Sequence, residues 1–210
     1  MSKPRLHGPA FSTYVRTCRL VLAEKGVDYD MNEFNFLEGW PDGYDALHPF
    51  RKVPAFEHGD VKLFETLAIA IYVDSAFEGP SLIPAAAADR ARCIQVCNVN
   101  DNYAYPALIT RTFIPRAVVP MLGGTTDEAK VEKARPDAER ALGVLEGLLG
   151  SNDYFTGAQP ALSDFHLLPV LHYTSQIPDG QAMLAKNLNL SAWLDRMNRR
   201  DSVKETIPAL

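Results

Sequence analysis

Strand-like patterns are confined to the first 80 residues of the chain, and the remainder is helical in pattern. Residues 5–8 read as a short strand, residues 12–26 as an amphipathic helix, and residues 27–31 as a second strand with one buried face. A strand, a helix and a strand within about 30 residues form a βαβ unit, which requires a parallel strand pair and a right-handed crossover.

Residues 51–66 add a hairpin and the start of a helix. Gly59-Asp60 is a two-residue turn signal between short apolar runs. Val53-Pro54 opens the first strand, where a missing N–H is tolerated. Glu65-Thr66 opens a helix that runs to about residue 77, and it places a carboxylate and a hydroxyl beside free amides, which suits a charged small molecule. An ordinary hairpin followed by a well-capped helix fits this stretch equally well.

The resulting order, β-α-β-loop-β-β-α, is the thioredoxin-like arrangement, and we expect it to form an α/β domain over residues 1–79. Residues 80–88 are rich in turn formers and read as a linker. Residues 89–210 predict an all-helical domain, in which Pro106 should kink or end the first long helix. Thr125 and Glu128 offer a capping box, and Pro136 should kink or restart the helix that follows.

Composition narrows the class of protein. The hydrophobic content of 47% and the charged content of 22% are globular values. A net charge of −5 argues against a nucleic-acid binder or a protein that binds anionic membranes. An anionic ligand would therefore need a local cationic patch, for which Arg16, Arg51 and Lys52 are candidates. No apolar run approaches the roughly 18 residues of a membrane span, and the first residues argue against a signal peptide.

The three cysteines, Cys18, Cys93 and Cys97, lie in helix-like sequence without a zinc-binding pattern. We interpret them as reduced thiols of a cytoplasmic protein that holds no metal.

Three local sequences carry a resemblance. His-Pro-Phe-Arg-Lys-Val-Pro-Ala-Phe at residues 48–56 is similar to an Asn-Pro-x-x-x-Val-Pro-x-Leu segment, and residues 63–69 are similar to Leu-x-Glu-Ser-x-Ala-Ile. Residues 8–12, with Arg16 four residues on, look like the start of a serine-type enzyme. In this order and spacing, the chain resembles the cytosolic glutathione S-transferases over nearly its whole length. Within that family it is similar to the serine-type classes (phi, theta and zeta) and to a bacterial-type member.

The chain departs from the family pattern at two places. Ala161 stands where the Ser/Thr-x-x-Asp capping box that ends at Asp164 usually has its hydroxyl, and losing such an N-cap costs about 1 kcal/mol. Ser12-Thr13-Tyr14 replaces the Ser-Ser-Cys run of the zeta enzymes, which weakens an isomerase assignment. Because position 12 is not a cysteine, the thiol-reductase chemistry of other classes also lacks its nucleophile.

The resemblance implies an enzyme that conjugates the glutathione thiolate to small hydrophobic electrophiles. Ser12 would stabilise the thiolate, with Thr13 or Tyr14 as alternatives. Glutathione would be the co-substrate, and the protein would be a cytoplasmic detoxification enzyme and a homodimer. The residues implied for the tripeptide are Lys52 for the glycine carboxylate, Val53 and a cis Pro54 for the cysteinyl backbone, and Glu65 with Thr66 for the γ-glutamyl group.

The electrophile pocket would lie between the domains. Its candidate residues are Phe11, Tyr105, Arg111 and Phe113. A glutathione-binding module without turnover is one alternative, and a glutathione-dependent isomerase, dehalogenase or peroxidase is another.

Overall fold

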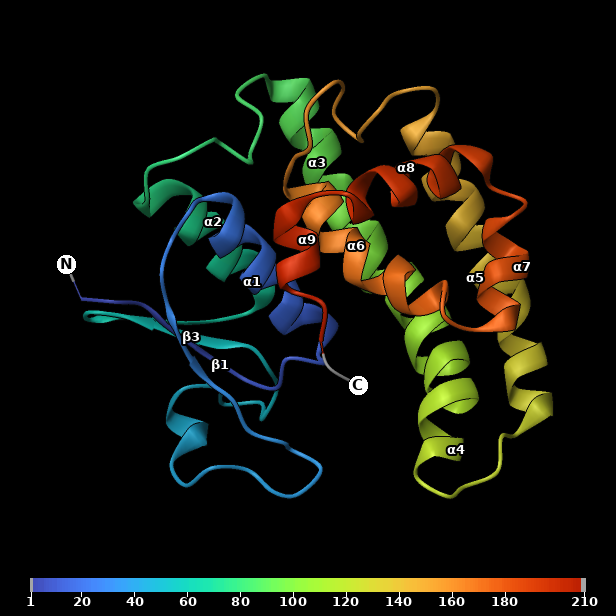
Figure 1. Ribbon diagram of the computed structural model, residues 1–210, viewed down its shortest axis with the longest axis horizontal. Helices are drawn as coiled ribbons and strands as arrows, with labels where there is room; N and C mark the ends of the chain where they lie inside the picture. Colours follow the sequence, from blue (N-terminus) through green and yellow to red (C-terminus); the bar gives the residue numbers. More distant parts are fainter. Residues whose placement is uncertain (1, 209–210) are drawn as a thin grey trace. The chain divides into compact units, whose positions relative to one another are not determined.

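A computed structural model describes residues 2–208 (Figure 1). The predicted order of strands and helices in the first part is confirmed, and so is the thioredoxin-like fold class. The elements are β1 (Arg5–His7), α1 (Thr13–Glu24), β2 (Asp30–Asn32), a short 3₁₀ turn η1 (Tyr44–Ala46), β3 (Ala55–His58), β4 (Val61–Phe64) and α2 (Thr66–Ala76).

The four strands form one mixed sheet in the order β2-β1-β3-β4. β1 is parallel to β2, as the βαβ unit requires, and antiparallel to β3, which pairs with β4 in the predicted hairpin. Leu6 and Phe56 lie opposite each other and are fully buried, so one face of the sheet is apolar. α1 and α2 pack against each other on one side of the sheet (Figure 1).

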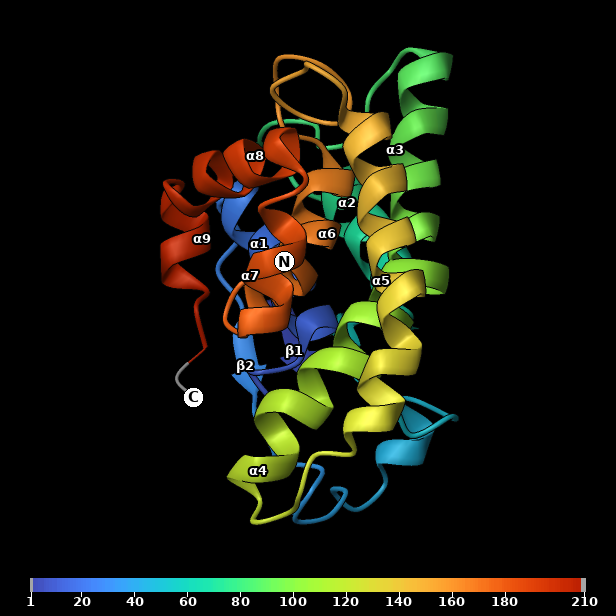
Figure 2. The ribbon, with the colours of Figure 1, turned by 90° about the vertical axis from the view of Figure 1, so that its right-hand side faces the viewer.

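The second part of the chain is helical, as predicted, and in Figure 2 its helices α3 and α5 run side by side. Its elements are α3 (Ala87–Val99), η2 (Asn100–Val118), α4 (Val119–Met121), α5 (Glu128–Leu149), α6 (Leu162–Thr174), α7 (Pro178–Leu184) and α8 (Leu188–Asn198). α6 is buried over almost its whole length and forms the centre of this part.

Of the two outcomes predicted for Pro106, ending the helix is wrong, because η2 is a π-helix of 19 residues that continues through it. A proline removes one backbone donor from such a helix, so some carbonyls need other partners. Two carbonyls of η2 also accept from side chains: Arg111 Nε donates to the Pro106 carbonyl at 3.2 Å, and Thr112 Oγ1 donates to the Ala107 carbonyl at 2.8 Å. Pro136 likewise lies inside an unbroken α5.

The predicted cap of α5 is also wrong. Asp127 is the N-cap, and its carboxylate accepts from the Lys130 N–H at 3.1 Å. An Asp at this position satisfies a free amide as well as a threonine would, and it carries a charge that favours the helix N-terminus. Thr126 instead donates its hydroxyl to the Pro115 carbonyl at 2.7 Å.

The chain forms two compact units, residues 2–83 together with 199–208, and residues 84–198. The sequence assigned residues 199–210 to the helical domain, whereas the described part of this segment groups with the sheet. It includes α9 (Asp201–Glu205), which is held against α1. Arg200 makes a two-point ion pair with Glu24 at 3.1 and 2.7 Å, Ser202 donates to the same carboxylate, and Arg19 donates to the Thr206 carbonyl at 3.1 Å.

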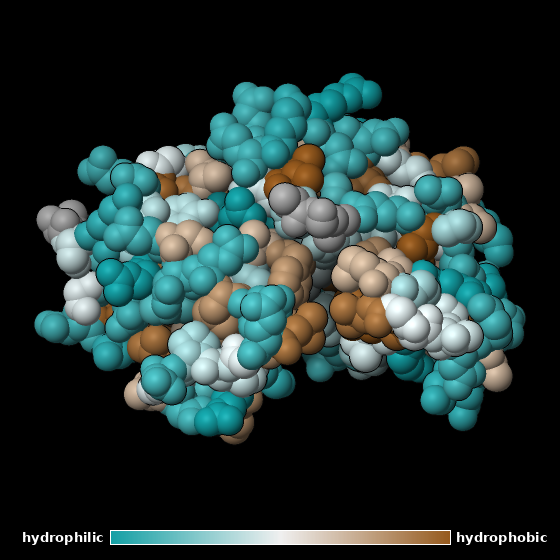
Figure 3. All heavy atoms as spheres, turned by 60° about the horizontal axis from the view of Figure 1, so that its bottom comes forward, coloured by the Kyte–Doolittle hydropathy of each residue, from teal (hydrophilic) through white to brown (hydrophobic). Residues whose placement is uncertain are grey.

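The surface drawn in Figure 3 is mainly hydrophilic, and its hydrophobic residues form separate small patches. Of the helices in residues 2–208, none combines the length and the hydropathy that crossing a bilayer requires.

Candidate active site

The sheet register gathers three of the predicted segments at one edge. His7, at the end of β1, lies opposite Ala55, at the start of β3, and Ala55 lies opposite Phe64, at the end of β4. The chain that leaves β1 therefore leads to Ser12, the chain that enters β3 comes from Val53, and the chain that leaves β4 leads to Glu65, all from the same edge.

A close backbone approach joins the first two segments. Gly8 has φ +133°, and a Cβ at this position would lie 2.8 Å from Val15 Cγ2 and 2.9 Å from the Val53 Cβ. Contacts this short leave no room for a side chain, so only glycine allows the loop before Ser12 to meet Val53.

Ser12 is the N-cap of α1, with extended backbone (φ −67°, ψ 129°). Its Oγ accepts a hydrogen bond from the Val15 N–H at 3.4 Å. A hydroxyl has one donor besides its acceptor lone pairs, so capping leaves the Ser12 proton available for an anion. The positive end of α1 lies at the same place and favours negative charge there.

The two alternatives to Ser12 differ from it in exposure. Thr13 keeps only 6% of its surface exposed, and it is the first residue of α1. Tyr14 is half-buried and already takes part in interactions within the protein.

The segment before β3 presents backbone groups. The Val53–Pro54 peptide bond is cis, as the resemblance predicts. Within the described residues, the Val53 N–H and C=O make no hydrogen bond to another protein group. Lys52 is exposed next to them and adds a positive charge. This segment therefore offers one donor, one acceptor and one cation side by side.

Glu65 and Thr66 begin α2. Glu65 is the N-cap, its φ is +71°, and its carboxylate makes no capping hydrogen bond. The carboxylate is exposed, whereas Thr66 is buried, with 7% of its surface accessible. Because no side chain of the cap residue satisfies them, the first amides of α2 can bind an anion, and the Glu65 carboxylate can bind a cation beside it.

The four electrophile-pocket candidates have different surroundings. Phe11 contacts the Phe36 ring edge-on, with 5.6 Å between centroids. Phe113 is 8% exposed and packs on Tyr173 within the helical unit. In the same unit, Arg111 pairs with Asp137 at 2.9 Å, and burial raises the pKa of Tyr105.

An aromatic row between residues 34 and 50 was not recognised from the sequence as part of the site. Phe36 stacks on Trp40 at 5.8 Å, and Trp40 contacts Tyr44 at 5.2 Å. Since Phe36 also contacts Phe11, the row continues to the residue next to Ser12. The signal was present, because this short stretch contains five Phe, Trp and Tyr residues among loop formers.

The comparisons with known proteins agree with this geometry. Residues 6–81 match the family model for the N-terminal domain of glutathione S-transferases, and residues 102–201 match that for the C-terminal domain. Glutathione S-transferase 3 of Zea mays is 33% identical, over 100% of this chain and 96% of that protein. The chain belongs to the glutathione S-transferase family.

Solved structures support the same assignment. An apo glutathione S-transferase III superposes on this transferase with a TM-score of 0.87 and 30% identity, and each chain is covered completely. Maize glutathione S-transferase I in complex with an atrazine–glutathione conjugate gives a TM-score of 0.86 and 27% identity, over 98% of this chain and 96% of that one. The predictions of the fold and of a glutathione transferase enzyme are confirmed at the level of the family.

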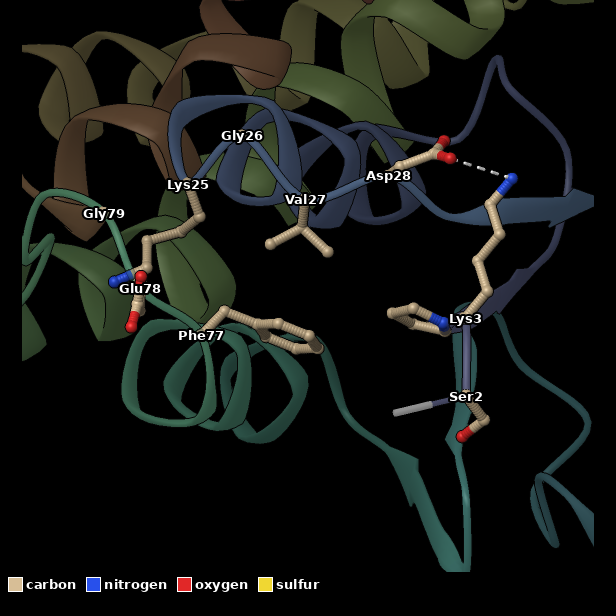
Figure 4. Close-up of a pocket in the computed structure, with 10 residues that line it drawn as sticks. Ser2, Lys3, Lys25, Gly26, Val27, Asp28, Phe77, Glu78 and Gly79 are labelled. Atoms are coloured by element: carbon tan, nitrogen blue, oxygen red, sulfur yellow. Dashed lines mark ion pairs between the residues drawn. The ribbon is translucent and has the colours of Figure 1, made fainter.

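A shallow cavity of about 400 Å³ lies elsewhere on the sheet-containing unit of the transferase (Figure 4). It is lined by residues 2–4, 25–28 and 77–79, which lie near the start of β1 and at the C-terminal ends of α1 and α2. Ser12 is at the other end of α1, which has 12 residues and is therefore roughly 18 Å long. This cavity is not part of the candidate active site.

Both lysines that line the cavity have partners. Lys3 pairs with Asp28 at 3.2 Å, as Figure 4 shows. The Lys25 ammonium donates to the carbonyls of Asp74 and Pro80 at 2.9 and 3.2 Å.

Cys18, Cys93 and Cys97 are buried free thiols. In the part of the chain that the structure describes, no group of three or more His, Cys, Asp and Glu side chains is arranged around a common point as metal ligands.

Proposed function

We propose that this transferase conjugates glutathione to small hydrophobic electrophiles and that Ser12 stabilises the thiolate. An unperturbed thiol has a pKa of about 8.5, so most glutathione is protonated at neutral pH, while the thiolate is the nucleophile. A hydrogen bond from Ser12 to sulfur favours the thiolate. The thiol proton leaves to solvent, the sulfur attacks the electrophilic carbon, and a leaving group departs with its electron pair where the electrophile carries one.

The observation that carries the proposal is the state of the Ser12 hydroxyl. Its oxygen accepts the Val15 amide at the start of α1, and within residues 2–208 the hydroxyl donates no hydrogen bond to another group. Thr13 is a weaker candidate because it is the first residue inside α1, whereas Ser12 is the N-cap.

The edge of the sheet offers a complementary group for each end of the tripeptide. In our proposal Glu65 binds the γ-glutamyl ammonium, and Thr66 with the first amides of α2 binds the adjacent carboxylate. The Val53 N–H and C=O pair with the cysteinyl residue as a neighbouring strand would. Lys52 binds the glycine carboxylate.

The electrophile class follows from the aromatic side chains. Phe11 and Phe36 form an apolar surface next to Ser12, and a planar apolar molecule packs well on such rings. The maize relative was solved with an atrazine–glutathione conjugate, which supports a small organic electrophile. We therefore propose aromatic and other hydrophobic electrophiles, with Tyr105 as a further contact. Arg111 and Phe113 remain candidates, although both have partners in the helical unit.

Class and assembly also belong to the proposal. Ser12 favours a serine-type enzyme, of phi, theta or zeta type. A homodimer is expected from the resemblance to the family. A molar mass equal to that of one chain, measured by light scattering, would contradict the dimer. The bacterial-type and cytoplasmic assignments stay predictions.

Replacing Ser12 tests the mechanism. Ser12→Ala should lower turnover about 10- to 1000-fold, as expected for one lost preorganised donor, and should leave glutathione affinity nearly unchanged. In the same variant the bound glutathione thiol should ionise at higher pH, as followed by the ultraviolet absorbance of the thiolate. Thr13→Ala is the matched control, and it should change neither quantity appreciably.

The alternatives give different results. A module without turnover would bind glutathione with an unshifted thiol pKa in the wild-type protein. An isomerase, dehalogenase or peroxidase would show its own product with glutathione and the matching substrate, and little conjugation of aromatic electrophiles. Unchanged turnover in Ser12→Ala would move the role to Tyr14 or to backbone amides.

A further inference from the structure

The η1 turn makes two side-chain contacts with the segment before β3. Tyr44 Oη donates a hydrogen bond of 2.8 Å to the Lys52 carbonyl. The next residue, Asp45, holds Arg51 through two bonds of 2.6 and 2.7 Å. Arg51 has φ +47°, an uncommon conformation for this residue type, so the chain turns sharply just before Lys52.

Tyr44 is itself firmly placed. Only 3% of its surface is exposed, and its ring contacts those of Phe34 and Trp40 at 5.1 and 5.2 Å. It also stacks on His48, with 6.5 Å between centroids and 17° between planes. A buried ring with neighbours on several sides has few rotamers available, so its hydroxyl is a fixed donor.

The carbonyl that Tyr44 holds belongs to the same peptide group as the Val53 N–H. This peptide is planar and trans, so its C=O and N–H point in opposite directions. A donor that fixes the carbonyl therefore also fixes the direction of the N–H, and it polarises the peptide so that the N–H becomes a better donor. The Val53 N–H makes no hydrogen bond within the described residues.

We propose that Tyr44 is a positioning residue for glutathione, because it orients the Lys52–Val53 peptide whose N–H binds the cysteinyl carbonyl. The inference rests on the proposed function and adds a determinant of affinity that does not itself touch the ligand. The Asp45–Arg51 pair closes the turn independently, so loss of the Tyr44 hydroxyl leaves the turn closed while the peptide gains freedom to rotate.

Removal of one hydroxyl tests this. Tyr44→Phe keeps the ring and its aromatic contacts, and we expect its dissociation constant for glutathione, measured by isothermal titration calorimetry, to rise about 3- to 10-fold, the effect of one hydrogen bond. The KM for glutathione should rise by the same factor, while kcat at saturating substrates should stay within about twofold, since Ser12 is unaffected.

Tyr72→Phe is the matched control. Tyr72 is in the same unit, and its hydroxyl bonds to His58 at 2.9 Å, away from the site. Both variants lose one tyrosine hydroxyl and should lose similar thermal stability, but only Tyr44→Phe should weaken glutathione binding.

The rate of hydrogen exchange of the Val53 amide, measured by NMR, reports directly whether glutathione binds this N–H. Glutathione should slow exchange of this amide strongly in the wild-type and Tyr72→Phe proteins, and clearly less in Tyr44→Phe. Equal affinity and equal Val53 protection in wild type and Tyr44→Phe would overturn the role of Tyr44 while leaving the proposed function intact. Absence of glutathione binding by the wild-type protein would overturn both.

Discussion

The hydrogen bonds of Asp164 allow a quantitative prediction of how a substitution changes the stability of the helical unit. Its carboxylate is completely buried at the start of α6 and accepts four hydrogen bonds. The Oδ1 atom accepts from the Phe155 N–H at 3.3 Å and from Trp193 Nε1 at 2.7 Å. The Oδ2 atom accepts from the Ala161 N–H at 2.9 Å and from Ser163 Oγ at 3.3 Å. Burial raises the pKa of Asp164, while the hydrogen bonds favour its charged form.

Asp164→Asn keeps the shape of the side chain and turns one acceptor into a donor. The amide oxygen should face Phe155 and Trp193, because neither of these donors can accept. The amide nitrogen then faces Ser163, whose hydroxyl can rotate to accept, and the Ala161 N–H, which loses its partner. The Ala161 N–H and one of the two N–H groups of the new amide are then buried without an acceptor, and at about 1–3 kcal/mol each we expect a loss of about 2–6 kcal/mol in the free energy of unfolding.

Ser163→Ala is the companion variant. It removes one of the four donors, and it should cost about 1 kcal/mol. In the double variant the Asn amide has no acceptor at Ser163, so the combined loss should exceed the sum of the two single losses by about 1 kcal/mol.

The assay uses the two tryptophans, of which Trp40 lies in the sheet-containing unit and Trp193 in the helical unit. In a Trp40→Phe background, urea unfolding followed by fluorescence reports on the surroundings of Asp164 through Trp193. A loss below about 0.5 kcal/mol for Asp164→Asn, or strict additivity in the double variant, would refute the assigned hydrogen-bond network.

Two further predictions concern the sheet-containing unit. Gly8→Ala should lower the free energy of unfolding by about 2–4 kcal/mol, because it adds both backbone strain and contacts below 3 Å, and the loss should appear as a lower Tm. Gly26→Ala is the control, since Gly26 has φ +65° but open space around it, and it should cost less. Equal losses in the two variants would contradict the crowding at Gly8. His7 is buried, which lowers its pKa, and its ring bonds to Glu57 and Asn32 at 2.9 Å each. The unfolded chain therefore binds more protons than the folded chain below about pH 6.5, so the free energy of unfolding should fall as the pH drops from 6.5 toward 5. His7→Gln should make this pH dependence flatter. A pKa of 6.5 or higher for His7, measured by NMR titration, would contradict the prediction.

Most strands and helices of the sheet-containing unit could be predicted from short local sequence patterns. The hairpin was predictable because a glycine at a tight turn, here Gly59 with φ +60°, is a property of two residues, and the strands beside it pair in the register this turn requires. The cis Val53–Pro54 bond and the helix start at Thr66 were predictable from short motifs at fixed spacing, and the tripeptide binding assigned to these segments stays a prediction.

The features that escaped prediction depend on partners distant in sequence or on side chains that rescue a broken local rule. Pro106 removes a backbone donor, as its ring requires, yet η2 continues through it. Ala161 lacks the capping hydroxyl, yet Asp164 still accepts its N–H. The Tyr44–Lys52 bond spans eight residues of irregular chain, and no periodicity marks such a contact.

The packing of α9 against α1 means that part of the sheet-containing unit can be completed only when the end of the described sequence has been synthesised. A ribosome releases residues 2–83 long before α9, so the ion pair of Glu24 with Arg200 and the bond from Arg19 to Thr206 form only after the intervening helices have been synthesised. The C-terminal half of α1, which carries Arg19 and Glu24, therefore reaches its final surroundings late in translation. A ribosome stalled before Arg199 would expose a sheet-containing unit that lacks part of its own structure.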